Sequence, residues 1–116
     1  MNQGISTVIY PVKDIRRAKK MFNGFLGVEP YADSAYYVGY KVGDQDIGLD
    51  PNAFNQGMKV PIGSYNVSDI KQSLQGLVEA GVQVLQEIKD VGGGKLIATV
   101  NDTDGNMIGL IQTPQE

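Results

Sequence analysis

The second half of the chain repeats the order of the first, and this repeat constrains the fold more than any other feature. Val12–Ile15 (VKDI) matches Val67–Ile70 (VSDI), and each motif follows an apolar run and precedes apolar residues at helical spacing. Gly27-Val28 then matches Gly81-Val82 in the same order. The agreement in order, spacing and capping residues indicates a duplicated architecture.

Each copy is expected to fold as a βαβββ module, with modules over residues 1–52 and 60–116 and a linker over 53–59. Asp14 and Asp69 suit helix N-caps, and a glycine ends each helical stripe. Because one module cannot bury both sheet faces, we expect a single α+β domain: a curved mixed sheet around a cavity, with helices outside. The expected helices cover 15–26 and 70–80, and the expected strands cover 5–10, 28–32, 35–42, 45–50, 60–67, 82–91, 95–100 and 107–112.

The composition excludes several kinds of site. The 116 residues include neither histidine nor cysteine, so a Ser-His-Asp triad, a thiol nucleophile and an imidazole zinc site are all unavailable. The net charge of −3 disfavours nucleic acid as a partner, because such a partner requires a basic face. The chain shows neither a signal peptide nor an apolar run of transmembrane length, so we expect a cytoplasmic protein without a membrane partner.

Three local patterns have ordinary structural explanations. Arg16, Arg17, Lys19 and Lys20 fall on the polar side of the first expected helix, which we interpret as a solvated face rather than a phosphate site. Gly92–Lys95 (GGGK) lacks the hydroxyl residue and following helix of a phosphate-binding loop, so a flexible strand connection is expected. Asp102–Asn106 (DTDGN) lacks the spacing of a calcium-binding loop.

Aromatic residues with a polar tip are suited to a pocket for a planar or amphipathic ligand. Any one tyrosine is better explained as sheet core whose hydroxyl reaches water. The set leaves both interpretations open. It comprises Tyr31, Tyr36, Tyr37, Tyr40 and Tyr65, together with Phe54.

Two segments resemble a known family. Val12–Val28, from VKDI through FLGV, resembles the first-module signature of the vicinal oxygen chelate superfamily, which contains glyoxalases, bleomycin-resistance proteins and extradiol dioxygenases. Asp102–Gln112 resembles its closing hairpin, with Asp104-Gly105 at the tight turn between two apolar runs. The likeness spans nearly the whole chain. It implies the paired-module fold, a small-molecule ligand and a homodimer.

The resemblance also indicates where a metal would be held. Metal-dependent members place a ligand on the first and last strands of each module, and motif matching carries these positions onto Thr7, Gly48, Ile62 and Gly109. Two glycines, an isoleucine and a threonine hydroxyl cannot hold a transition metal, so we expect the metal-free branch, without a metal site or cofactor. Asp46 and Asp50 flank Gly48 on one strand face, but an oxygen-only site needs several more ligands.

Strand alternation within this implied fold predicts which side chains line the cavity. Tyr37 is included on the condition that strand 35–42 turns that face inward, and Phe54 would close the mouth from the linker. Lys41 is a candidate on the same condition, that strand 35–42 turns this face inward. The predicted ligand-binding residues are Thr7, Ile9, Tyr37, Asp50, Phe54, Ile62, Ser64, Asn66 and Met107.

Two functions remain open at this point. The leading hypothesis is a non-catalytic protein of the glyoxalase/bleomycin-resistance type that binds a small molecule and sequesters a toxic or antibiotic compound. It assigns no catalytic residue. The alternative is an isomerase or lyase of the same superfamily, with Asp50 or Lys41 as acid or base and with or without a weakly bound divalent metal. The sequence leaves enzymatic activity undecided.

Overall fold

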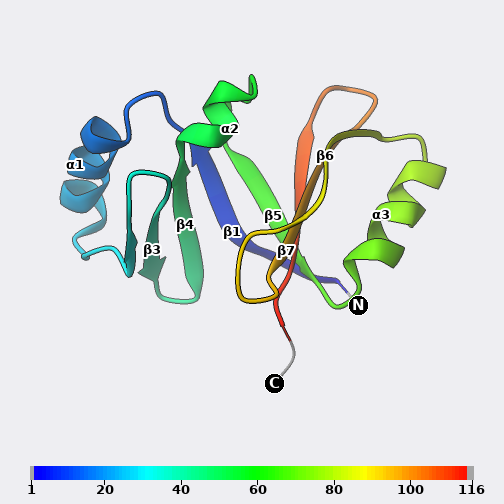
Figure 1. Cartoon of the computed structure of the whole chain (residues 1–116), viewed down its shortest axis with the longest axis horizontal. Coiled ribbons are helices and arrows are strands. Elements are labelled where there is room, and N and C mark those ends of the chain that lie inside the picture. The colour runs from blue at the N-terminus through cyan, green and yellow to red at the C-terminus, as the bar shows by residue number, and fades with distance from the viewer. Residues whose placement is uncertain (1, 115–116) are drawn as a thin grey trace. The chain divides into compact units, whose positions relative to one another are not determined.

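The computed structural model describes residues 2–114, which form eight strands and three helices of a mixed α+β fold (Figure 1). The predicted fold class is therefore confirmed. The chain divides into an N-terminal unit, Thr7–Ile62, and a C-terminal unit that joins the residues up to Ser6 to those from Gly63 onward. Strand β1 (Asn2–Pro11) contributes to both units. None of the helices within the described residues has the length and apolarity to cross a membrane.

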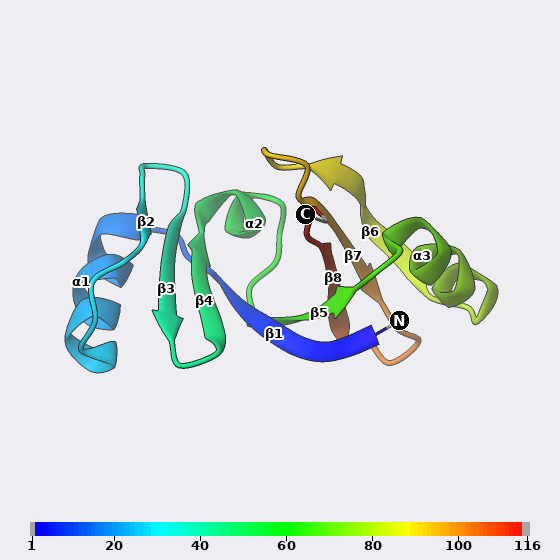
Figure 2. The ribbon, with the colours of Figure 1, turned by 90° about the horizontal axis from the view of Figure 1, so that it is seen from below.

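Four neighbouring strands form the sheet of the N-terminal unit, in the order β2-β3-β4-β1 (Figure 2). β3 pairs antiparallel with β2 and β4, whereas β4 pairs parallel with β1. The helix α1 packs against β3 and β4. After β1, the elements are α1 (Ile15–Leu26), β2 (Ala32–Asp33), β3 (Val38–Val42), β4 (Gln45–Asp50) and the short helix α2 (Pro51–Asn55).

The ends of α1 follow the sequence prediction. The Asp14 carboxylate accepts a hydrogen bond from the Arg17 N–H, and Gly27 takes the left-handed conformation at the C-cap with φ of 71°. The apolar stripe of α1 packs onto one face of the sheet. The buried residues of this core are Phe22, Val38, Tyr40 and Leu49.

The C-terminal unit repeats this plan, with strand order β5-β8-β7-β6. β8 pairs parallel with β5 and antiparallel with β7, and α3 packs against β6, β7 and β8 (Figure 1). Its buried core residues are Val67, Ile70, Leu74, Ala98, Val100 and Leu110. The elements are β5 (Ile62–Val67), α3 (Ile70–Glu79), β6 (Gln83–Asp90), β7 (Leu96–Asn101) and β8 (Met107–Gln112).

Three of the expected segments that differ from the structure do so because of a local hydrogen bond or backbone restraint. The strand expected at 35–42 begins only at Val38, because the Ser34 hydroxyl accepts from the N–H groups of Tyr36 and Tyr37 and holds a turn. The strand expected at 28–32 shrinks to Ala32–Asp33, after Pro30, which has no N–H to donate. The linker 53–59 overlaps α2, which an aspartate cap and a proline in the first turn favour.

The turn between β7 and β8 is organised by the carboxylate of Asp102. Its Oδ1 accepts from the N–H groups of Asp104 (2.9 Å) and Asn106 (2.8 Å), and its Oδ2 accepts from the Asn106 side-chain amide (2.9 Å). These bonds, above all that from the Asn106 side chain, lower the pKa of Asp102 below its ordinary value of 3.8. A lowered pKa means that this stabilisation is present above pH about 3.8 and lost as the pH falls through the folded-state pKa.

Acidification is therefore expected to loosen this turn below pH about 3.8. NMR titration should show the amide signals of Asp104 and Asn106 moving together with a midpoint below that of a free aspartate. In Asp102→Asn the same signals should not show this step. A midpoint at or above the ordinary pKa of aspartate would contradict the prediction.

Candidate functional site

The face of the N-terminal sheet that points away from α1 carries the main polar cluster of this unit. Val38, Tyr40 and Leu49 pack against α1, so the residues between them on β3 and β4 point to the opposite face. Tyr37 also lies on this opposite face, over Gly48, and its place in a ligand cavity stays a prediction. We call this face the tyrosine face, and it comprises Tyr31, Tyr37, Lys41 and Asp46 with Gly39 and Gly48.

Two glycines allow the tyrosine rings to lie directly against the sheet. Gly39 and Gly48 are paired across β3 and β4. A Cβ added at Gly48 would lie 2.8 Å from the ring atoms Cε1 and Cζ of Tyr37, and one added at Gly39 would lie 2.9 Å from Cζ of Tyr31. Real side chains do not tolerate such distances, so glycine is required for this close approach.

Hydrogen bonds and an ion pair fix the polar ends of the tyrosine face. The Tyr31 hydroxyl donates to Asp46 Oδ1 at 2.7 Å, and Lys41 Nζ lies 3.3 Å from Asp46 Oδ2. Burial, followed by the charge of Asp46, raises the pKa of Tyr37. Burial and the bond to Asp46 raise the pKa of Tyr31 likewise. Both phenols are therefore protonated at neutral pH, and the face offers apolar rings with hydroxyl groups beside the carboxylate that is ion-paired with Lys41.

Three of the predicted lining residues lie in β1 and at the start of β5. Thr7 is buried and pairs with Asp46, and Ile9 pairs with Gly48. Both therefore share the sheet face of the tyrosine cluster. Ile62 is buried, with 4% of its surface exposed. Their contact with a ligand remains a prediction.

Asp50 and Phe54 lie at and beyond the end of β4. Asp50 Oδ1 accepts hydrogen bonds from the N–H groups of Asn52 (2.9 Å) and Ala53 (3.2 Å), so its carboxylate caps α2. Phe54 lies in α2, and the ammonium of Lys59 is 5.6 Å from the centre of its ring. The structure thus gives Asp50 a structural role beside the ligand-binding role that the sequence predicts.

The remaining predicted residues, Ser64, Asn66 and Met107, belong to the C-terminal unit. They alternate with residues that pack against α3 and so point to the opposite face of that sheet. Asn66 Nδ2 donates to Gln3 Oε1 at 3.2 Å. Ser64 is buried, and its Oγ covers the position where a Cβ of Gly109 would lie.

The four positions that would hold a metal in this type of fold do not fit one. Tyr37 occupies the space beside Gly48, and Ser64 occupies the space beside Gly109. Within residues 2–114, no three acidic, histidine or cysteine side chains are grouped as a metal site. The donor set therefore offers no transition metal a coordination shell.

The sequence prediction placed Asp46 on the correct strand face but left it, together with Tyr31, out of the binding set. Tyr31 was assigned to a strand, whereas it lies just before β2 and reaches back over Gly39. The available signal was the pair of glycines inside two adjacent strands. Such glycines mark a place where another group approaches the backbone.

The comparison with known families agrees with this geometry. The family model for the Glyoxalase/Bleomycin resistance protein/Dioxygenase superfamily matches residues 4–110. The chain belongs to this superfamily. The membership confirms the resemblance carried by the first-module signature and the closing hairpin. No curated protein matches the chain in sequence.

Solved structures of the superfamily share the fold at low sequence identity. Methylmalonyl-CoA epimerase from Mycobacterium tuberculosis is 18% identical, with a TM-score of 0.75 over 98% of this chain and 90% of that chain. A glyoxalase/bleomycin resistance protein/dioxygenase superfamily member from Vibrio splendidus 12B01 is 17% identical, with a TM-score of 0.69 over 97% and 99%. At this identity the likeness extends to the fold alone.

Proposed function

We propose that the protein binds a small planar or amphipathic organic molecule on the tyrosine face, without catalysing its conversion. The observation that carries the proposal is the pair of tyrosine rings laid over Gly39 and Gly48, with protonated hydroxyl groups at their ends. Such rings offer apolar area with a polar tip, which suits a ligand of mixed character. Sequestration of a toxic or antibiotic compound is the role that fits a binder of this superfamily.

The alternative, an isomerase or lyase, has less support from the side chains assigned to it. Oδ1 of the Asp50 carboxylate accepts two backbone N–H groups, which fixes this side chain as the cap of α2, and the Lys41 ammonium is paired with Asp46. A general base must be within reach of a substrate proton and free to accept it. The likeness to a methylmalonyl-CoA epimerase keeps this alternative in view, although it concerns the fold.

The remaining parts of the proposal concern the setting of the site. We propose a homodimer, in keeping with the resemblance on which the fold was first expected. Size-exclusion chromatography with light scattering measures the oligomeric state, and a monomer at all concentrations would remove this part of the proposal.

The binding proposal is tested with the full chain and planar aromatic alcohols, beginning with 2-naphthol. Ligand binding to the native state should raise the melting temperature, and NMR should show saturable shifts at the amides of Gly39 and Gly48. Tyr37→Ala should raise the Kd at least about tenfold, because it removes a ring that would stack on the ligand.

Tyr36→Ala provides the matched control. Tyr36 is adjacent in sequence and 82% exposed, and its hydroxyl has no part in the tyrosine face. Its replacement should leave the Kd within about twofold, well below a 1.4 kcal/mol effect. The proposal fails if no compound of the series shifts the two glycine amides, or if both alanine variants weaken binding equally.

A further inference from the structure

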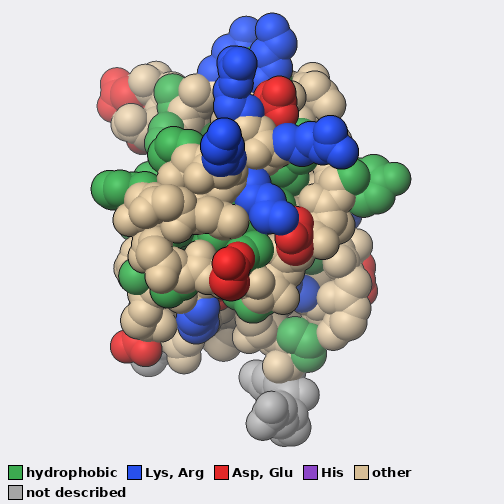
Figure 3. All heavy atoms as spheres, turned by 90° about the vertical axis from the view of Figure 1, so that its left-hand side faces the viewer, with side chains coloured by type: hydrophobic (Ala, Val, Ile, Leu, Met, Phe, Trp, Pro, Cys, Tyr) green, Lys and Arg blue, Asp and Glu red, His purple; other side chains and the backbone are tan. Residues whose placement is uncertain are grey.

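The basic residues of this acidic protein are concentrated at the start of α1. Both arginines of the chain and three of its lysines fall within residues 13–20, although the net charge is −3. Figure 3 shows Lys and Arg side chains gathered on one part of the face that α1 presents. One hollow in this region is lined by Lys13, Arg16, Arg17 and Lys19. We call it the basic hollow.

The basic hollow has a volume of about 960 Å³ and an apolar wall formed by Ile15, Val38 and Pro51. Of its two acidic residues, Asp33 is ion-paired with Lys19, whereas Asp14 accepts from the Arg17 backbone N–H and keeps its negative charge. In the part of the chain that the structure describes, the side chains of Lys13, Arg16 and Arg17 form no ion pair. An excess of unpaired positive charge therefore borders the hollow.

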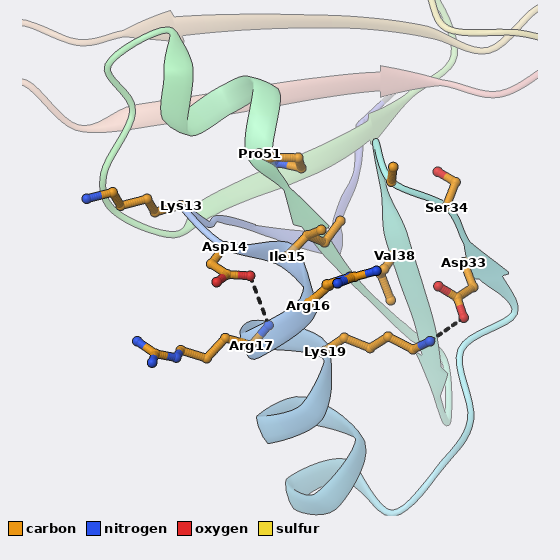
Figure 4. Close-up of a pocket in the computed structure, with 11 residues that line it drawn as sticks. Lys13, Asp14, Ile15, Arg16, Arg17, Lys19, Asp33, Ser34, Val38 and Pro51 are labelled. Carbon is orange, nitrogen blue, oxygen red and sulfur yellow. Dashed lines mark hydrogen bonds and ion pairs between the residues drawn. The ribbon is translucent and has the colours of Figure 1, made fainter.

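The cations lie on two sides of Asp14. Figure 4 shows Arg16 extending across the hollow toward Val38, whereas Lys13 and Arg17 project on the other side. Two or three linked phosphates offer oxygen acceptors to cations on both sides of Asp14, whereas a single phosphate offers one compact set. Guanidinium groups recognise phosphate oxygens through paired hydrogen bonds, which favours a phosphate ligand over a simple halide.

We propose that the basic hollow binds an oligophosphate group, with Arg16 on one phosphate and Arg17 and Lys13 on the next. The apolar wall would contact the organic part when the oligophosphate belongs to a small molecule such as a nucleoside diphosphate. This site lies on the helix side of the sheet, opposite the tyrosine face, and is independent of the function proposed there. Under this proposal the basic side of α1 binds an anion, whereas the sequence predicted a solvated face.

An anionic membrane surface is the competing partner, because Met21 and Phe25 are exposed on the same helix. Phe25 is 78% exposed, but it lies eight residues beyond Arg17, a distance of about 12 Å along the helix axis. The unpaired cations are among the residues that line a concavity, which a flat surface would leave unfilled. The arrangement therefore favours a small anion.

The test is an NMR titration of the isotope-labelled full chain with inorganic pyrophosphate and, separately, adenosine diphosphate, at low ionic strength. Saturable shifts are expected at the amides of residues 13–19 and 33–35. Tighter binding of adenosine diphosphate would assign the site to an organic oligophosphate, and equal binding would assign it to the inorganic anion. Orthophosphate should bind more weakly than either.

The variants are matched in charge. Arg16→Gln/Arg17→Gln should raise the Kd for pyrophosphate at least about tenfold, since charge-assisted hydrogen bonds are lost. Lys71→Gln/Lys89→Gln removes the same charge from exposed residues of α3 and β6 and should change the Kd less than about twofold. Arg16→Lys/Arg17→Lys keeps the charge but loses the paired hydrogen bonds of the guanidinium groups. Its Kd for pyrophosphate should lie between those of the unmodified chain and of the arginine-to-glutamine pair.

Three results would overturn the proposal. They are the absence of saturable shifts in the unmodified chain, equal weakening by the two glutamine pairs, and full affinity in the lysine pair. Co-sedimentation with vesicles of phosphatidylglycerol and phosphatidylcholine, without pyrophosphate binding, would identify a membrane surface instead. Circular dichroism of each variant confirms that it is folded before its affinity is compared.

Discussion

Tyr40→Ala is expected to lower the free energy of unfolding of the N-terminal unit by about 3–5 kcal/mol, the largest effect of any substitution considered. Tyr40 is 0% exposed and packs with Phe22, Val38 and Leu49 between β3 and α1. Its hydroxyl also donates to α1, where Asn23 Oδ1 (2.5 Å) is the nearer acceptor and the Lys19 carbonyl (3.2 Å) the farther one. The substitution therefore removes a large buried ring together with a link between sheet and helix.

Chemical denaturation followed by circular dichroism measures this change. Tyr40→Phe retains the ring and should cost about 1 kcal/mol, the contribution of its hydrogen bonds. Tyr36→Ala, at the exposed tyrosine, should stay within about 0.5 kcal/mol of the unmodified chain. If Tyr40→Ala costs no more than Tyr40→Phe, the ring does not support the core as described.

Gly109→Ala is expected to lower the free energy of unfolding of the C-terminal unit by about 2–3 kcal/mol, in the upper part of the range for overpacking. A Cβ at Gly109 would meet the Ser64 hydroxyl and would lie 3.2 Å from the Ser64 Cα. β5 and β8 are paired at these two residues, so the Ser64 side chain must move and the strand backbone must shift by a few tenths of an ångström. At Gly48, by contrast, the atoms in the way belong to the end of the Tyr37 side chain, which can rotate aside.

Gly24→Ala and Gly76→Ala are the matched controls for this glycine series. Both residues lie inside helices, where an added Cβ would meet nothing within 4 Å. Each replacement should raise the free energy of unfolding by about 0.5–1 kcal/mol, because alanine loses less backbone entropy in a helix. From the highest free energy of unfolding to the lowest, the expected order is Gly76→Ala, the unmodified chain, Gly48→Ala and Gly109→Ala. Gly109→Ala at or above the unmodified chain would contradict the packing at Ser64.

The order of the elements could be predicted because it depends on neighbours in sequence. Asp14 and Asp69 cap helices three residues ahead, and Gly27 ends a helix with its own backbone. The alternation along β4 also placed Asp46 and Gly48 on one face correctly. These signals act over a few residues, so the sequence carries them directly.

Contacts between distant segments could not be predicted in this way. The hydrogen bond from Tyr31 to Asp46 joins a residue that precedes β3 in the sequence to one that follows it. No pattern in the sequence specified this bond. The basic hollow likewise required α1, β3 and the start of α2 to meet around one concavity.

The sequence by itself determined the α+β class, the duplicated order of elements, the superfamily and the lack of metal-binding side chains at the expected positions. Only the tertiary structure decided that Tyr31 and Tyr37 cover Gly39 and Gly48, that Asp50 caps α2, and that unpaired arginines border a hollow. The physical reason is that periodicity and capping are local. Ring placement and charge pairing depend instead on which residues packing brings together from far apart in the chain.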